Sequence, residues 1–246
     1  MNTVRSTLPL GLLAALALVS ANALAAPGDG IEGSEHDFSG IGSPPTGLCT
    51  FCHTPHKAQA TALLWNHTLS SNSFSWDDPT TTGGTDYPSF SGDTYKGPTA
   101  KCLSCHDGSV AVGDIGWWNG GEPSSPLLNT VLTGAYQIGE GGDMSGNHPV
   151  AMPFPFGDTA NTYNGSTNGS AAVASGWQSD PESLGIRLFH DDGSGNIAAG
   201  AVSGQTGMEC TSCHDVHNNA SVDSFLLLGT LGGSGTDYIC SKCHSK

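Results

Sequence analysis

Four copies of one short motif constrain this sequence more than any other feature. Each copy has two cysteines separated by two residues, with a histidine directly after the second cysteine. The copies span Cys49–His53, Cys102–His106, Cys210–His214 and Cys240–His244, and together they use all eight cysteines of the 246-residue chain. Histidine accounts for only 10 of the 246 residues, so its presence after every cysteine pair is not a chance feature.

The C-x-x-C-H spacing has a specific chemical use. Two thiols one helical turn apart can add to the two vinyl groups of one porphyrin, and the next residue then reaches the iron. Structural zinc, a disulfide framework or a redox C-x-x-C pair would also explain paired cysteines, but none of them requires the histidine. We therefore expect four haem c groups. Their attachment residues would be Cys49, Cys52, Cys102, Cys105, Cys210, Cys213, Cys240 and Cys243, with His53, His106, His214 and His244 as proximal iron ligands.

Residues 1–25 are typical of a secretory signal peptide. Arg5 supplies a charged start, residues 8–19 form an apolar run too short to cross a membrane, and residues 23–25 offer small residues for cleavage. We expect a single mature domain over residues 26–246 without a membrane span. Export is consistent with c-type haem attachment, which takes place outside the cytoplasm.

The composition argues against an ordinary hydrophobic core. Glycine accounts for 35 residues, and aromatic residues make up only 7% of the chain. Apolar burial alone would struggle to offset the ordering entropy of such a polypeptide, whereas four large macrocycles would replace many core side chains. We therefore expect a multihaem cytochrome c fold, which is mostly coil and loops around four haems, with short helices at the haem-binding motifs and little β structure.

The charge balance limits the partners. The chain has 22 acidic against 7 basic residues and a formal net charge of −15. This excludes nucleic acid as a natural partner and disfavours anionic lipid. Basic proteins, metal ions and cationic mineral surfaces stay open, and the acidity also keeps an exported protein soluble.

Local patterns outside the motifs predict a few further elements. Gly108 is expected to end a short helix. Residues 187–196 indicate a hairpin turn, with His190 exposed. Residues 70–98 are expected to form a loop that covers a haem edge with aromatic side chains, and residues 157–180 a surface insertion.

Six histidines lie outside the motifs and could supply the sixth iron ligands: His36, His56, His67, His148, His190 and His217. His56 and His217 each follow a proximal histidine by three residues, so each projects from the same side as that histidine and must bind a different haem. His36 can fold back from an N-terminal arm, and Pro149 holds His148 extended. His67 is a further candidate.

Methionine is the alternative axial ligand. Met144 and Met152 flank His148, and a methionine ligand would raise the reduction potential of its haem. Histidine fits the expected set of ligands better than methionine does. Bis-histidine irons leave no open position for a substrate, so we expect electron transfer and no enzymatic activity.

The motifs also resemble those of a known family. They are Ser-x-His-Asp at His36, C-x-F-C-H-T-P-H at 49–56, L-W-N-H at 64–67, C-L-S-C-H-D-G at 102–108, N-H-P-V at 147–150, C-T-S-C-H-D-V-H-N at 210–218 and a terminal C-x-x-C-H. This series is similar to that of the exported tetrahaem cytochromes of the outer-membrane cytochrome E type, members of which polymerise into extracellular nanowires. The similarity covers nearly the whole mature chain, except for residues 157–200.

The resemblance implies a continuous chain of haems and at least one iron whose distal histidine comes from a neighbouring subunit. It places His36, His56, His148 and His217 in the distal set, with His56 or His36 acting in trans. The expected protein is an exported homopolymer, built by head-to-tail contacts, which forms a filament at or beyond the cell surface and carries electrons to other redox proteins or extracellular acceptors.

Two alternatives stay open. The spare histidines permit all ligation within one chain, as in a monomeric periplasmic tetrahaem shuttle. A small multihaem reductase would instead need one iron with an exchangeable position.

Overall fold

The computed structural model describes residues 25–59, 62–75, 97–148, 150–156, 176–191, 197–223, 225–233 and 235–245. The expected signal peptide, except for residue 25, lies outside the described residues. So do residues 76–96 and 157–175, which hold most of the two expected loops. Within the described ranges, no helix has the length and apolar character needed to cross a membrane.

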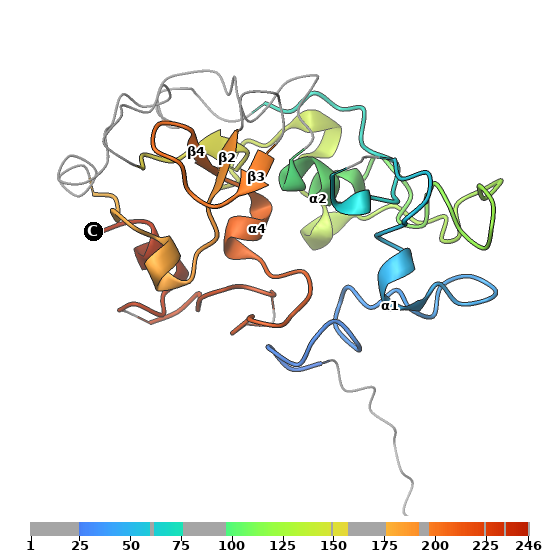
Figure 1. The fold of residues 1–246 in the computed structure, drawn as a ribbon, viewed down its shortest axis with the longest axis horizontal. Coiled ribbons are helices and arrows are strands. Elements are labelled where there is room, and N and C mark those ends of the chain that lie inside the picture. The colour runs from blue at the N-terminus through green and yellow to red at the C-terminus, as the bar shows by residue number, and fades with distance from the viewer. Residues whose placement is uncertain are drawn as a thin grey trace, which may run out of the picture.

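Coil predominates in the described chain, and the helices are short (Figure 1). The α-helices are α1 (Gly47–Thr50), α2 (Pro98–His106) and α4 (Cys210–Cys213). Short 3₁₀ segments cover Ala62–Leu64, Gly134–Tyr136, Glu140–Gly142, Glu182–Leu184 and Ile239–Lys242. Each of the four C-x-x-C-H motifs overlaps one of these helical segments. A coil-rich backbone does not by itself define a multihaem cytochrome c fold, which stays a prediction.

Helix α2 is bounded by residues that suit its ends. Pro98 lies in the first turn, where its missing N–H costs nothing. Gly108 follows the C-cap residue Asp107 with a φ of +72°. The expected helix end at Gly108 is confirmed, because glycine adopts this left-handed conformation without a steric cost.

Helix α4 begins at a capping box that also contacts α2. Glu209 N donates to Ser212 Oγ at 3.0 Å, and the Glu209 side chain accepts a hydrogen bond from the backbone of Ser212. The buried Glu209 carboxylate also accepts a hydrogen bond from Thr99 N at 2.8 Å, and Cys210 N donates to Thr99 Oγ1 at 3.0 Å. These bonds hold the starts of α2 and α4 together.

One small antiparallel sheet is present among the described residues. Its strands are β1 (Met152–Pro153), β2 (Phe189–Asp191), β3 (Ile197–Ala199) and β4 (Thr206–Met208), in the order β1-β4-β2-β3. β2 pairs antiparallel with β3, as a hairpin over residues 187–196 requires, and the turn itself, residues 192–196, lies outside the described residues.

The expected exposure of His190 is wrong. The residue is half-buried in β2, where it pairs with Ala198. Its Nδ1 atom donates to Gly200 O at 2.8 Å, which holds the ring against the end of β3.

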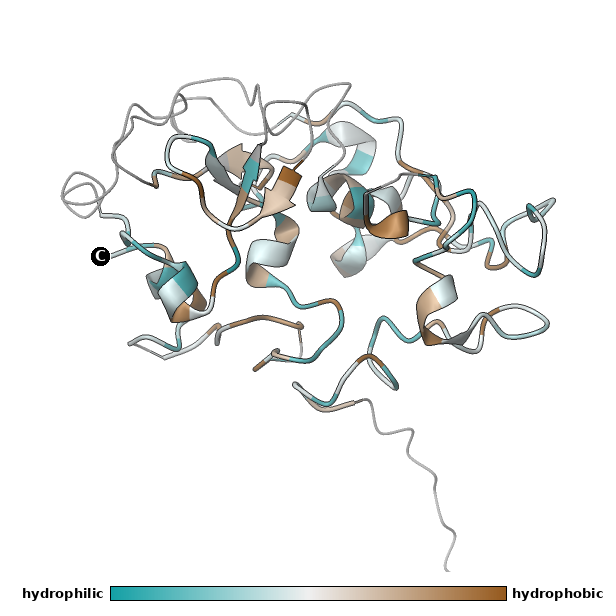
Figure 2. Ribbon diagram, viewed as in Figure 1, coloured by the Kyte–Doolittle hydropathy of each residue, from teal (hydrophilic) through white to brown (hydrophobic). Residues whose placement is uncertain are grey.

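A side-chain core joins the sheet to the fourth motif. Phe154 and Leu188 are fully buried in it, and Trp177 packs against it. The buried members of this cluster are Met152, Phe154, Ile186, Leu188, Met208, Leu228, Ile239 and Cys243. Apolar residues are also spread along the loops (Figure 2). Part of the stability therefore comes from ordinary apolar packing.

Candidate haem-binding sites

All eight cysteines of the four motifs lie in described segments and have free thiols. None of these cysteines forms a disulfide, the alternative that the sequence analysis set aside. In the described part of the chain, no three Cys, His, Asp or Glu side chains converge as a metal-binding group. A haem iron takes only two axial ligands from the protein, so pairs of histidines are the relevant arrangement.

Cysteines of successive motifs lie next to one another. Burial raises the pKa of Cys105 to about 12, with a further contribution from Cys52 of the first motif. Cys102 of the second motif shares a hydrogen bond with Cys210 of the third, which raises the pKa of Cys102.

The third and fourth motifs are neighbours in the same way. Burial raises the pKa of Cys243 to about 12, and the nearby charge of Cys213 adds to the shift. Each motif therefore has a cysteine near a cysteine of the next motif in the sequence, and the pair of His53 and His217 also brings the first motif close to the segment that follows the third.

Three of the four motif histidines have the same backbone support. His53 Nδ1 donates to Leu63 O at 2.6 Å, and His106 Nδ1 donates to Tyr136 O at 2.8 Å. His214 Nδ1 donates likewise to the carbonyl oxygen of Phe225 at 2.8 Å. A carbonyl oxygen can only accept, so Nδ1 carries the proton in each ring. This tautomer leaves Nε2 with the lone pair that binds a metal.

The three residues that provide these carbonyl groups also have exposed apolar side chains. Leu63, Tyr136 and Phe225 are 59%, 63% and 63% exposed. This role could not be predicted from the sequence, because every residue type has a backbone carbonyl group. Apolar side chains beside a candidate metal ligand are suited to cover a flat hydrophobic group.

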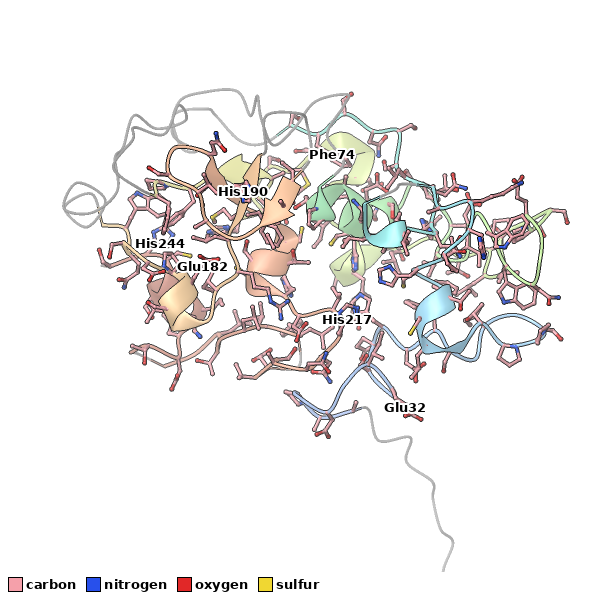
Figure 3. All side chains as sticks on the ribbon, in the orientation of Figure 1. Glu32, Phe74, Glu182, His190, His217 and His244 are labelled. Atoms are coloured by element: carbon pink, nitrogen blue, oxygen red, sulfur yellow. The ribbon has the colours of Figure 1, made fainter. Side chains whose placement is uncertain are left out.

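Three motif histidines each face a second histidine from a distant segment. The ring centres are 6.2 Å apart for His106 and His36, and 6.3 Å apart for His53 and His217. The pair of His244 and His148 has a spacing of 6.4 Å. Figure 3 shows that His217 and His244, one from each of two pairs, lie in different parts of the molecule.

These spacings match two imidazoles on opposite sides of one metal ion. A metal–nitrogen bond of about 2 Å and about 1.1 Å from the nitrogen to the ring centre place two such centres about 6.2 Å apart. Trp65 lies 6.0 Å from His53, but an indole ring offers no nitrogen for iron. The residues present therefore fit bis-histidine iron at three of the four motifs.

His36 has the environment of a neutral ligand. Burial, together with the nearby charges of His106, His214 and His217, lowers the pKa of His36 to about 4. Its Nδ1 atom is buried without a hydrogen-bond partner. Metal binding requires the neutral imidazole, which this site favours.

His214 and His56 have no such partner ring among the described residues. Both side chains are exposed. Thr54 Oγ1 accepts a hydrogen bond from His56 N at 3.3 Å and donates to His56 O at 3.0 Å, which fixes the backbone at His56.

His67 has a different environment from the paired histidines. It is buried, with Nδ1 2.7 Å from Thr68 O and Nε2 2.9 Å from Ala111 O. Its Nε2 atom is also 3.4 Å from Cys105 Sγ.

Two buried aspartates directly follow motif histidines and were not singled out from the sequence. Asp107 accepts hydrogen bonds from Ser70 Oγ and from Asn72 Nδ2. Asp215 lies 3.2 Å from Arg187 Nη2. Burial alone would raise the pKa of Asp215, but hydrogen bonds from the backbone and from Arg187 lower it overall. The order Cys-His-Asp, which the second and third motifs share, could have indicated these two aspartates from the sequence.

Neither a protein-family model nor a curated protein sequence matches this chain significantly.

Proposed function

We propose that this protein is an exported electron-transfer protein that binds four haem c groups covalently and has no enzymatic activity. The observation that carries the proposal is the set of three histidine pairs with ring centres 6.2 to 6.4 Å apart. Each pair joins a C-x-x-C-H histidine to one of the expected distal histidines. When bound, haem supplies reversible one-electron chemistry at its iron.

The chain's own residues have defined roles in this proposal. The eight cysteines attach the macrocycles, and the carbonyl groups of Leu63, Tyr136 and Phe225 hold three proximal rings in the metal-binding tautomer. The distal partners within one chain are His217 for His53, His36 for His106 and His148 for His244. Two histidines would hold each of these irons, so no position would be left for a substrate.

The neighbouring cysteines support a continuous path. Cys102 of the second motif shares a hydrogen bond with Cys210 of the third. Cys52 and Cys213 lie near enough to Cys105 and Cys243, respectively, to raise their pKa values. Macrocycles attached at these cysteines would follow one another through the subunit in sequence order.

The unmatched pair supports assembly into a filament. His36 already faces His106, so His56 is the remaining member of the expected distal set, and His214 is the remaining proximal ligand. We assign His56 of one subunit to His214 of its neighbour. Such a contact joins two different surfaces and, when it does not close, gives an open head-to-tail polymer at or beyond the cell surface. Other redox proteins or extracellular acceptors would receive the electrons.

His67 is left outside this ligand set. Carbonyl oxygens at both ring nitrogens occupy the positions that an iron ion would need. We assign it to support of the backbone near Cys105.

The first experiment measures haem content and spin state. Protein from an exporting host that attaches c-type haem should carry four haems per chain and give a wholly low-spin ferric spectrum after assembly. A chain without covalent haem would overturn the proposal, and a five-coordinate high-spin iron in the assembled protein would instead support a reductase.

The second experiment tests the polymer. The variant His56→Ala should lose filaments in electron microscopy while all four haems stay attached, and the exposed irons should become partly high-spin. The control His190→Ala should keep its filaments. Filaments that persist in His56→Ala would refute this assignment, and wild-type protein that occurs only as monomers would favour the periplasmic shuttle.

A further inference from the structure

Asn218, directly after His217, docks the N-terminal arm. Its side chain is 1% exposed. Its Nδ2 atom donates to Ala26 O at 2.9 Å and to Gly30 O at 3.0 Å, and its Oδ1 atom accepts a hydrogen bond from Gly28 N at 3.0 Å. The backbone carbonyl of Asn218 accepts a fourth hydrogen bond from Gly30 N at 2.9 Å. Both amide N–H groups and the amide oxygen of this side chain are therefore used to hold the arm.

The docked arm leads directly to His36. Figure 1 shows the arm, in blue, beside the segment that follows α4. Ser34 Oγ donates to Ile31 O at 2.7 Å and accepts a hydrogen bond from His36 N at 3.2 Å. This turn places the His36 ring 6.2 Å from the ring of His106. Asn218 thus lies at the base of the segment that carries one distal histidine and directly beside another, His217.

His36 lacks the support that the motif histidines have. His53, His106 and His214 each donate Nδ1–H to a backbone carbonyl, whereas His36 Nδ1 is buried without a partner. A metal-bound histidine without such an acceptor is less basic and less firmly oriented. The position of His36 therefore depends on its chain neighbours more than on hydrogen bonds of its own ring: the docked arm lies before it, and after it the Phe38 ring stacks on Phe51 with centres 4.5 Å apart.

We propose that Asn218 is a positioning residue that keeps His36 opposite His106, and that undocking of the arm opens this one iron to a small π-acceptor ligand such as carbon monoxide. The inference rests on the proposed haem ligation. In the exchange, the bond between iron and the His36 nitrogen breaks and a bond between iron and the carbon of carbon monoxide forms. No electron is transferred, and His36 leaves as the neutral imidazole.

The test variant is Asn218→Gly. Asn218 has a φ of +54°, a left-handed conformation that glycine adopts freely, so this change removes the side-chain hydrogen bonds without adding backbone strain. The matched control is Asn219→Gly at the exposed neighbouring position. Asn219 N donates to Asp215 Oδ2 at 2.9 Å, a bond that glycine retains.

The measurement is the rate of carbon monoxide binding to the fully reduced, four-haem protein in its assembled form, in which His56 of the neighbouring subunit occupies the His214 iron, in a stopped-flow instrument. Each lost hydrogen bond is worth roughly a factor of five, so three together should raise the population of the undocked arm, and with it the binding rate, by about 100-fold. The fast phase should account for one haem per chain. Asn219→Gly should bind carbon monoxide as slowly as the wild type.

Two further variants keep the test decisive. Asn218→Asp still accepts the hydrogen bond from Gly28 N but turns a carboxylate oxygen toward the carbonyl oxygens of Ala26 and Gly30, so its rate should rise at least as much as that of Asn218→Gly. His36→Ala should show a fast phase of carbon monoxide binding that accounts for one haem per chain. Adding Asn218→Gly to His36→Ala should change neither the rate nor the amplitude of this phase.

The outcomes separate this inference from the function on which it rests. Fewer than four haems in the wild type, or an assembled wild type that is not low-spin, would contradict the proposed function. Four low-spin haems in the wild type with wild-type rates in both Asn218 variants would overturn only the role of Asn218. An additional rate increase from Asn218→Gly in the His36→Ala background would also overturn it.

Discussion

The side-chain core at the sheet gives a direct test of what stabilises this protein. Leu188 is 0% exposed and lies in the cluster with Phe154, Met208 and Cys243 of the fourth motif. The change Leu188→Ala removes buried apolar atoms and leaves a cavity, which should lower the free energy of unfolding by about 3 kcal/mol. Guanidinium chloride unfolding of the haem-loaded protein, followed by near-ultraviolet and visible circular dichroism, measures the loss.

The control removes the same atoms at the surface. Leu231 is 55% exposed, so Leu231→Ala should change the free energy of unfolding by less than about 0.5 kcal/mol. A loss for Leu188→Ala no larger than that for Leu231→Ala would refute a stabilising core. The stability would then come from the haems alone, as the glycine-rich composition led us to expect.

Further predictions concern the first and third motifs. Asn66 is 0% exposed and donates to Thr50 O and Trp117 O at 2.8 Å each. Asn66→Ala should therefore lower the free energy of unfolding by about 2 kcal/mol. In the visible spectrum, it should selectively perturb the first motif. The lowered pKa of Asp215 means that its carboxylate stabilises the fold above the unfolded pKa of 3.8, and that this contribution is lost as the pH falls through the lower folded value. Asp215→Asn should therefore lower the free energy of unfolding at neutral pH, and the difference in unfolding free energy between the variant and the wild type should shrink in acid. Denaturant midpoints between pH 2 and 7 measure this difference. A difference that does not change with pH would contradict this reasoning.

Local signals were sufficient for some elements. The helix end at Gly108 is confirmed, because a left-handed glycine is decided by neighbouring residues, and the two strands that flank residues 192–196 pair as a hairpin requires. His190 was wrongly expected to be exposed, since the contact of its ring with Gly200 depends on the register of the finished hairpin.

Long-range contacts could not be read from the pattern. His53 and His217 are far apart in the sequence, and no residue type indicates that their rings lie 6.3 Å apart. The backbone acceptors of the motif histidines were missed for a similar reason, because any residue type can provide a carbonyl group. The core at Leu188 gathers residues from several segments, and the alternating pairs Met152 with Phe154 and Ile186 with Leu188 are too short to predict that these segments pack together.

The three histidine pairs have a consequence for how the chain reaches its fold. The segments between His36 and His106, between His53 and His217, and between His148 and His244 overlap along the sequence. Iron bonds across all three pairs would close interlocking loops and restrict the unfolded chain as crosslinks do. If the proposed haems were attached before these loops close, each iron would first meet several competing histidines. Mispaired ligands are therefore the expected kinetic traps, and conditions that weaken iron–imidazole bonds, such as mild acid, should speed refolding.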